Sequence, residues 1–249
     1  MLDWLRSAPK PPISEAERAW IEGRFNWLTK EFGPKRLLTA PLILPTSAFF
    51  PSTYHGTEAE LVTIMARVAE FMDIDPGLLR LNFYVDSHPK FEGQWNHGTA
   101  GLYLESDGYF DIWLEASKLE DPLGVVATVA HEIGHVILLG QRRVSPDEED
   151  HELLTDLVTV FMGMGIFSAN SVIQEGYWWR GISSGWSMAR QGYMSMNMHG
   201  YALALYALAR SDLRPRWASY LRPDVRSALK QSLRFIQKTD ECTCAFPET

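Results

Sequence analysis

One stretch decides how the rest of the chain is interpreted: residues 121–140, with the sequence DPLGVVATVAHEIGHVILLG. Asp121 followed by Pro122 is a typical helix start, because aspartate caps free N–H groups and proline fits the first turn. Gly140 is a typical residue at a helix end. The residues between are almost wholly apolar, and the exceptions are Thr128, His131, Glu132 and His135. We therefore expect a buried helix that carries three ionisable groups.

The two histidines, His131 and His135, are four residues apart, and Glu132 directly follows the first. On an α-helix this spacing places both imidazoles on one face, one turn apart, where they can bind a single tetrahedral zinc ion. Glu132 lies roughly 100° further round the helix, where its carboxylate can reach a water molecule beside the metal. The pattern predicts a zinc site with Glu132 as the general base. The alternative is a chance match in a core helix, which would bury these groups without partners at a cost of several kcal/mol.

A catalytic zinc ion needs a third protein ligand and an open position for water. The metzincin pattern places a glycine and then a histidine after the second histidine, but Leu138 and Gln141 occupy these positions, so this pattern fails. A second pattern takes a glutamate from a later helix, with an aspartate one turn beyond it. Glu152 and Asp156 satisfy that second pattern.

Through these two motifs the chain resembles the gluzincin group of zinc peptidases, over about residues 100–166. The resemblance implies that Glu152 is the third ligand and that Asp156 is the acceptor that orients His131. Helix geometry agrees, because Asp156 lies on the same face as Glu152 and ligating histidines usually donate their second N–H to a carboxylate. Two alternatives stay open: His151 as the third ligand, or a plain acidic helix start that favours the helix dipole.

The same resemblance implies a substrate-binding strand and a donor for the oxyanion. We expect residues 109–115 to form the edge strand along which an extended peptide binds. Candidates for the hydrogen-bond donor to the oxyanion are Tyr193, His199 and Tyr201. For each of the three the alternative is a purely structural role, as a packed aromatic side chain or a surface histidine.

The remaining sequence predicts an α+β fold that is mostly helical. Capping boxes at Ser14 with Glu17 and at Thr57 with Glu60 predict two N-terminal helices. Alternating residues predict a strand over 79–85 and a hairpin with arms 101–105 and 109–115 around Asp107-Gly108. Helices are also expected from Ser145-Pro146 and over 201–210 and 223–237, with a long irregular region over 167–200.

These elements predict one zincin-like domain over residues 1–249, with a small mixed sheet packed on the active-site helix. We expect a mixed N-terminal lobe to about residue 140 and a helical C-terminal lobe over about residues 141–249. For the region rich in tryptophan and methionine, core packing is the commoner use, and a hydrophobic substrate wall is the alternative. Its members are Tyr177, Trp178, Trp179, Trp186, Met188, Met194, Met196 and Met198.

Composition narrows the range of partners. The formal charge is −8 and no run of basic residues occurs, which argues against binding to nucleic acid or to an anionic membrane. The first residues lack a signal-peptide core and we find no long uncharged apolar window, so secretion and a membrane span are not expected. Cys242 and Cys244 are too close in sequence to staple a domain. We expect a cytoplasmic protein.

The leading hypothesis is a zinc-dependent hydrolase, a metallopeptidase that cleaves a peptide or protein substrate with Glu132 as its base. One alternative is a non-catalytic binding or regulatory module that keeps the metal site as a structural centre. Another is hydrolysis of a non-peptide amide, which would use the same residues. The sequence does not reveal the oligomeric state.

Overall fold

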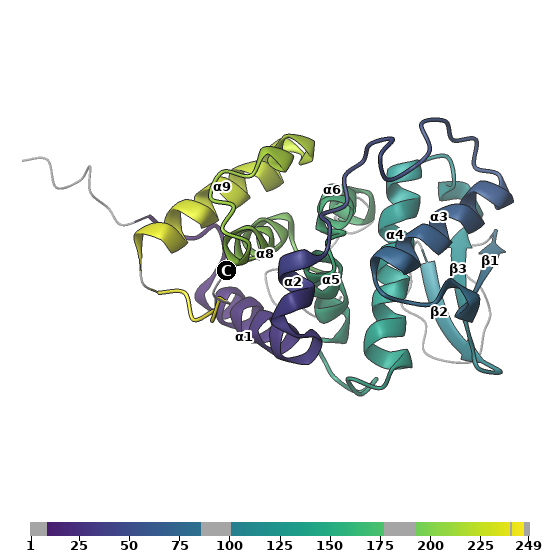
Figure 1. The fold of residues 1–249 in the computed structure, drawn as a ribbon, viewed down its shortest axis with the longest axis horizontal. Coiled ribbons are helices and arrows are strands. Elements are labelled where there is room, and N and C mark those ends of the chain that lie inside the picture. Colours follow the sequence, from purple (N-terminus) through teal and green to yellow (C-terminus); the bar gives the residue numbers. More distant parts are fainter. Residues whose placement is uncertain (1–8, 86–100, 177–192, 240, 247–249) are drawn as a thin grey trace, which may run out of the picture.

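The computed structural model describes residues 9–85, 101–176, 193–239 and 241–246, and Figure 1 shows their arrangement. The structure is 59% helical and has one small three-stranded mixed sheet, which confirms the expected α+β class. Five members of the region rich in tryptophan and methionine lie outside the described residues, namely Tyr177, Trp178, Trp179, Trp186 and Met188.

Three helices form the N-terminal part: α1 (Glu15–Phe32), α2 (Pro34–Thr39) and α3 (Glu58–Phe71). Both predicted capping boxes are present, because Ser14 and Thr57 each accept from the backbone of a glutamate three residues on and bind its carboxylate in return. These two helix starts were therefore predictable from four residues.

The sheet contains β1 (Leu79–Tyr84), β2 (Gly101–Ser106) and β3 (Tyr109–Glu115), and a short 3₁₀ turn, η2 (Pro76–Leu78), precedes β1. The strand order is β1-β3-β2, with β1 parallel and β2 antiparallel to β3. The hairpin turn at Asp107-Gly108 has positive φ angles of 51° and 79°, as a two-residue turn of type I′ requires. The predicted hairpin is confirmed.

The prediction that residues 109–115 form an edge strand was wrong. β3 is the middle strand, since β1 and β2 pair with its two sides, and its side chains Ile112 and Leu114 are buried. Alternating hydrophobicity indicates which face of a strand is buried but not how many neighbours the strand has. Among the described strands β2 and β1 form the edges, and β2 also packs on α4.

The central helix α4 (Pro122–His135) continues as a π-helical turn, η4 (Val136–Gly140). The carboxylate of Asp121 accepts from the N–H of Leu123 at 3.0 Å, so the predicted cap is present. The π-helical turn ends at Gly140 as expected, and the next positive φ angle falls on Arg142. In Figure 1 the sheet lies on one side of α4, whereas α5 and α6 lie on its other side.

α4 with its π-helical turn is also long and apolar enough to cross a membrane, by length and composition. In the fold 67% of this segment is buried. Helices α3, α5 and α6 and strands β2 and β3 pack on α4, so here it serves as the core helix on which the other layers are built.

The C-terminal part is helical and consists of α5 (His151–Phe161), α6 (Gly165–Gly176), α8 (Met196–Ala209), η6 (Arg216–Tyr220) and α9 (Pro223–Lys238). The short turn η3 (Ala116–Lys118) links β3 to α4. Helix α1 packs on α5 and α8, so the first described helix lies among the last ones (Figure 1). The single domain with a division near residue 140 stays a prediction.

The prediction of a helix start at Ser145-Pro146 was wrong, because α5 begins at His151. The hydroxyl of Ser145 accepts from the N–H of Asp147, two residues on, and so closes a local turn instead of capping a helix. Asp150 at the true helix start is bound by side chains of α1, which no local pattern reveals.

The prediction of an irregular region over residues 167–200 was wrong for residues 167–176 and 196–200, which are helical, whereas residues 193–195 lie in neither a helix nor a strand. α6 occupies Gly165–Gly176, and α8 begins at Met196, where the hydroxyl of Ser195 accepts from the N–H of Met198. Ile166 and Phe167 in α6 are buried in the core. Tertiary burial thus outweighs the weak helix propensity of the glycine and serine residues there.

Candidate metal centre

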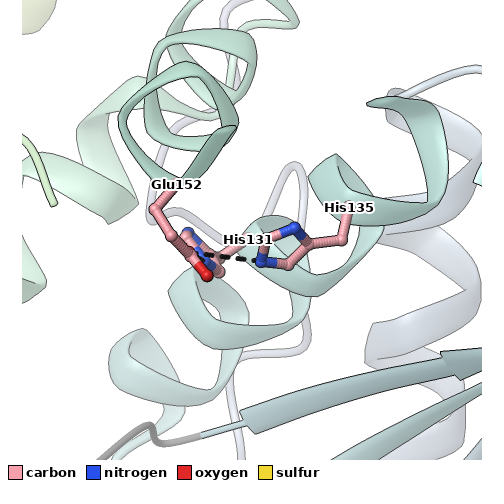
Figure 2. A group of neighbouring side chains, drawn as sticks. All are labelled: His131, His135 and Glu152. Atoms are coloured by element: carbon pink, nitrogen blue, oxygen red, sulfur yellow. Dashed lines mark hydrogen bonds and ion pairs between the residues drawn. The ribbon is translucent and has the colours of Figure 1, made fainter. Parts of the chain in front are cut away.

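Two helices that pack against each other bring the predicted metal ligands together. His131 and His135 come from consecutive turns of α4, and Glu152 comes from the first turn of α5. Their ligand atoms all lie within 4.8 Å of one another, and Figure 2 shows the three side chains converging on one point. Among the described residues this is the group that could hold a metal ion.

The inner atoms of this cluster are the distal ring nitrogens and one carboxylate oxygen. Glu152 Oε2 lies 3.2 Å from His131 Nε2 and 3.4 Å from His135 Nε2. The two imidazole planes are nearly perpendicular, at 84°, with ring centroids 4.8 Å apart. Two imidazoles and one carboxylate thus offer three ligand atoms to one site, a donor set found in catalytic zinc centres.

Outer partners fix the orientation of both rings. His131 Nδ1 lies 3.0 Å from Asp156 Oδ1, and His135 Nδ1 lies 3.3 Å from the hydroxyl of Thr155. That hydroxyl donates to the backbone carbonyl of His151 at 2.7 Å, so it accepts from the ring. Both Nδ1 atoms therefore carry a proton and both Nε2 atoms face the cluster, as metal ligands require.

The cluster needs a positive charge at its centre, because Glu152 Oε2 and His135 Nε2 are both acceptors. Burial opposes a charge on His131, but its hydrogen bonds to Asp156 and Glu152 outweigh burial and raise its pKa well above the ordinary value. Burial lowers the pKa of His135. A proton on His131 supplies the missing charge, and a metal ion can take the place of that proton.

Glu132, the predicted base, is almost completely buried, with 3% of its surface exposed. Burial raises its pKa to about 8, against the opposing effect of His131 and with a smaller contribution from the charge of Glu152. A carboxyl group with such a pKa can both accept and release a proton near neutral pH.

The close approach of α4 and α5 depends on Gly134. A Cβ atom at this position would meet Thr155 Cγ2 at 2.8 Å and the carbonyl oxygen of Thr155 at 3.3 Å. The glycine therefore allows Thr155 to reach the ring of His135 and allows α5 to carry Glu152 up to both histidines. Neither Gly134 nor Thr155 was identified from the sequence, although Thr155 lies three residues after Glu152 and so on a neighbouring helical position.

The start of α5 is also held from α1. Arg24 donates from Nε and Nη2 to the two carboxylate oxygens of Asp150, each at 2.7 Å, and Trp20 Nε1 donates to Oδ2 at 2.6 Å. Asp150 directly precedes the helix that carries Glu152. A bidentate arginine–carboxylate pair is geometrically specific, so α1 helps to fix the position of Glu152, the predicted third ligand.

Asp156 joins the metal cluster to the chain before α8. Its Oδ1 bonds His131, and its Oδ2 accepts the backbone N–H of Met194 at 2.8 Å. The neighbouring ring of Tyr193 lies over His131 with a centroid distance of 5.3 Å and a tilt of 39°. Of the three expected oxyanion donors, Tyr193 is thus the one whose ring contacts a predicted metal ligand.

The other two expected donors differ in their surroundings. His199 is 1% exposed and lies within electrostatic reach of Asp156 and His131; burial lowers its pKa. Its Nδ1 lies 3.2 Å from the carbonyl oxygen of Ser195, and its Nε2 has no hydrogen-bond partner among the described residues. The hydroxyl of Tyr201 donates to the buried carboxylate of Glu22 on α1, so the structure does not bring it together with the predicted metal ligands.

His151, the rival third ligand, stays outside the cluster. Its Nδ1 lies 3.8 Å from Glu152 Oε1, the carboxylate oxygen that does not face the two histidines. Its ring lies 6.0 Å from that of His135. The structure thus groups Glu152 and not His151 with His131 and His135.

Comparisons of the chain with protein-family models, with curated proteins and with solved structures found no match in any of the three. The metal centre is therefore inferred from its own residues and their geometry.

Proposed function

We propose that the chain is a zinc-dependent hydrolase of the gluzincin type, a metallopeptidase with a zincin-like fold. The observation that carries this proposal is the convergence of two imidazole nitrogens and one carboxylate oxygen beside a buried glutamate. His131, His135 and Glu152 would hold the zinc ion, and a set of two histidines and one glutamate leaves a further position open for water. Bound zinc would supply Lewis acidity toward that water and toward a substrate carbonyl.

The protein groups around this site have separable roles in the proposed reaction. Glu132 takes a proton from the attacking water and later gives it to the leaving amine. Asp156 and Thr155 hold the two histidine rings in the orientation that presents Nε2. Tyr193 is the proposed donor to the developing oxyanion, since its ring already lies against His131.

The sheet favours a peptide as the substrate. Strand β2 packs on α4, the helix that carries both histidines, and has one hydrogen-bonded neighbour among the described strands. An extended peptide can add to such an edge through main-chain hydrogen bonds. We propose β2, in place of β3, as the strand along which a peptide or protein substrate lies. We also propose that the reaction takes place in the cytoplasm.

The test combines metal content with turnover. We expect about one zinc ion per chain by elemental mass spectrometry, and loss of that zinc in His131→Ala and in Glu152→Ala. Glu132→Gln is expected to keep the zinc but to lower cleavage of a fluorogenic peptide library by roughly 100-fold or more, because the base is lost. Glu149→Gln is the matched control, since this carboxylate is exposed.

Three results would count against the proposal. A folded parent that cannot be loaded with zinc would remove the metal site. One zinc per chain without cleavage of any peptide or amide would leave a non-catalytic module with a structural centre. Full activity in Glu132→Gln would exclude the proposed base.

A further inference from the structure

A second site with reactive side chains lies on the other side of α1, away from the cluster of His131, His135 and Glu152. Residues 241–246 run along α1 and are held by its side chains. Glu22 Oε2 accepts from the backbone N–H of Thr243 at 2.9 Å and from its hydroxyl at 2.7 Å. One turn further on, Asn26 donates to the carbonyl oxygen of Thr243 and accepts from the N–H of Ala245, each at 3.1 Å. These bonds fix the backbone of the segment.

Burial alternates along this segment. Glu241, Thr243 and Ala245 are exposed, whereas the residues between them, Cys242 and Cys244, are half-buried and pack against the hydrophobic core. An extended backbone places residues i and i+2 on the same face. The two free thiols therefore lie side by side against α1.

The surroundings of the two thiols differ. Cys244 Sγ donates to the backbone carbonyl of Glu22 at 3.8 Å. The neighbouring Cys244 thiol lowers the pKa of the Cys242 thiol, against the effect of burial. The neighbouring Cys242 thiol, together with burial, raises the pKa of Cys244. Cys242 thus ionises first, and the thiolate is the nucleophilic form of cysteine.

We propose that Cys242 and Cys244 form a redox-active dithiol that a small-molecule disulfide, such as oxidised glutathione, converts reversibly into an internal disulfide. The Cys242 thiolate attacks one sulfur of the glutathione disulfide, forms a mixed disulfide and releases one glutathione thiolate. Cys244 then loses its proton to solvent and attacks the sulfur of Cys242, which releases the second glutathione. The protein loses two protons and two electrons, and one glutathione disulfide is reduced to two thiols.

This exchange has a structural consequence at α1. Oxidation removes the S–H of Cys244 and with it the hydrogen bond to the carbonyl of Glu22. The new bond spans a single intervening residue, so the ring that it closes is small and strained. Strained disulfides are the readily reduced ones, and we expect the oxidised form to return to the dithiol in reduced glutathione. This inference is independent of the proposed zinc chemistry.

The experiment uses the full-length protein in glutathione buffers of graded oxidation, with acid quench and intact mass spectrometry. The parent is expected to lose the mass of two hydrogen atoms without retaining glutathione, and to regain them in reduced glutathione. Cys244→Ser is expected to stop at the mixed disulfide on Cys242. Cys242→Ser is expected to react more slowly, because burial still raises the pKa of the remaining Cys244 thiol. Circular dichroism confirms the fold of each variant.

Two results would overturn the proposal. One is a parent protein that stops at a stable glutathione adduct, because then the second thiol does not resolve the first. The other is a folded parent that does not react under conditions in which the urea-unfolded chain is oxidised, because then the fold protects the thiols instead of pairing them.

Discussion

Replacing Gly134 with alanine is expected to weaken metal binding without unfolding the protein. A Cβ atom at this position would lie 2.8 Å from Thr155 Cγ2, whereas carbon atoms in contact are about 3.5–4.0 Å apart. Helix α5 therefore has to move away from α4 by about 1 Å. The hydrogen bond between Thr155 and His135, already 3.3 Å long, would then be lost, and Glu152 would move away from both histidines.

Two effects of this substitution on stability oppose each other. Overpacking costs about 1–3 kcal/mol, while alanine in place of glycine inside a helix gains about 1 kcal/mol. The net loss of stability is thus about 0–2 kcal/mol by these figures, so the free energy of unfolding is a poor test of the predicted helix displacement. Metal affinity is the sharper measurement, because losing an outer partner of a ligand typically lowers affinity by roughly 10- to 100-fold.

The assay is competition for zinc with a chromophoric chelator, with Gly134→Ala compared with the double variant Gly134→Ala/Thr155→Ser. Serine keeps the hydroxyl that bonds His135 but lacks the methyl group that the new Cβ would meet. We expect the double variant to recover most of the affinity and Thr155→Ser alone to resemble the parent. Parent affinity in Gly134→Ala, or no recovery in the double variant, would refute the idea that this contact sets the spacing of the ligands.

Three further outcomes follow from the described contacts. Asp156→Asn is expected to lower zinc affinity by roughly 10- to 100-fold, because the charge that orients His131 is lost; chelator competition measures it. Tyr193→Phe is expected to lower kcat of peptide cleavage by roughly 10- to 100-fold with zinc content unchanged, if its hydroxyl stabilises the oxyanion. Hydrogen bonds from Thr57 lower the pKa of Glu60 to about 2, so its contribution to stability is present above its unfolded pKa and is lost as the pH falls through about 2. Urea unfolding of the parent and Glu60→Gln is expected to differ near neutral pH and to converge in acid.

Controls separate these outcomes from general damage. Asp156→Glu keeps the charge and tests whether its position matters as well. For Tyr193→Phe, loss of zinc together with activity would indicate a packing role for the ring. For the capping glutamate, Glu58→Gln changes an exposed carboxylate in the first turn of the same helix, and an equal stability loss in that variant would contradict the specific role of Glu60.

The parts of the fold that were predictable are those whose signals are local. Capping boxes fixed the starts of α1 and α3, because both partners of each box lie within four residues. The hairpin was predictable because Asp107-Gly108 tolerates the two positive φ angles of its turn. The two histidines of the candidate site followed from helical spacing, and Glu152, which the resemblance to the gluzincins implied, is grouped with both of them.

The parts that were not predictable depend on contacts between distant residues. The start of α5 is set by Arg24 and Trp20, more than a hundred residues earlier in the chain. The central position of β3 depends on the pairing of β1, which its own alternation does not encode. The bond between Thr155 and His135 requires two helices to approach at a glycine, which sequence spacing alone does not indicate.

The carboxylate of Asp156 binds two groups at once: one oxygen bonds the ring of His131, and the other accepts the backbone N–H of Met194. A change in one of these two hydrogen bonds of Asp156 changes the stability of the other, and thermodynamic linkage makes the coupling free energy equal in both directions. A substrate or protein that draws the backbone of Met194 away from Asp156 would lower the affinity of the proposed site for a metal ion. Binding of that ion would, by the same free energy, stabilise the hydrogen bond between Asp156 on α5 and the segment that leads into α8.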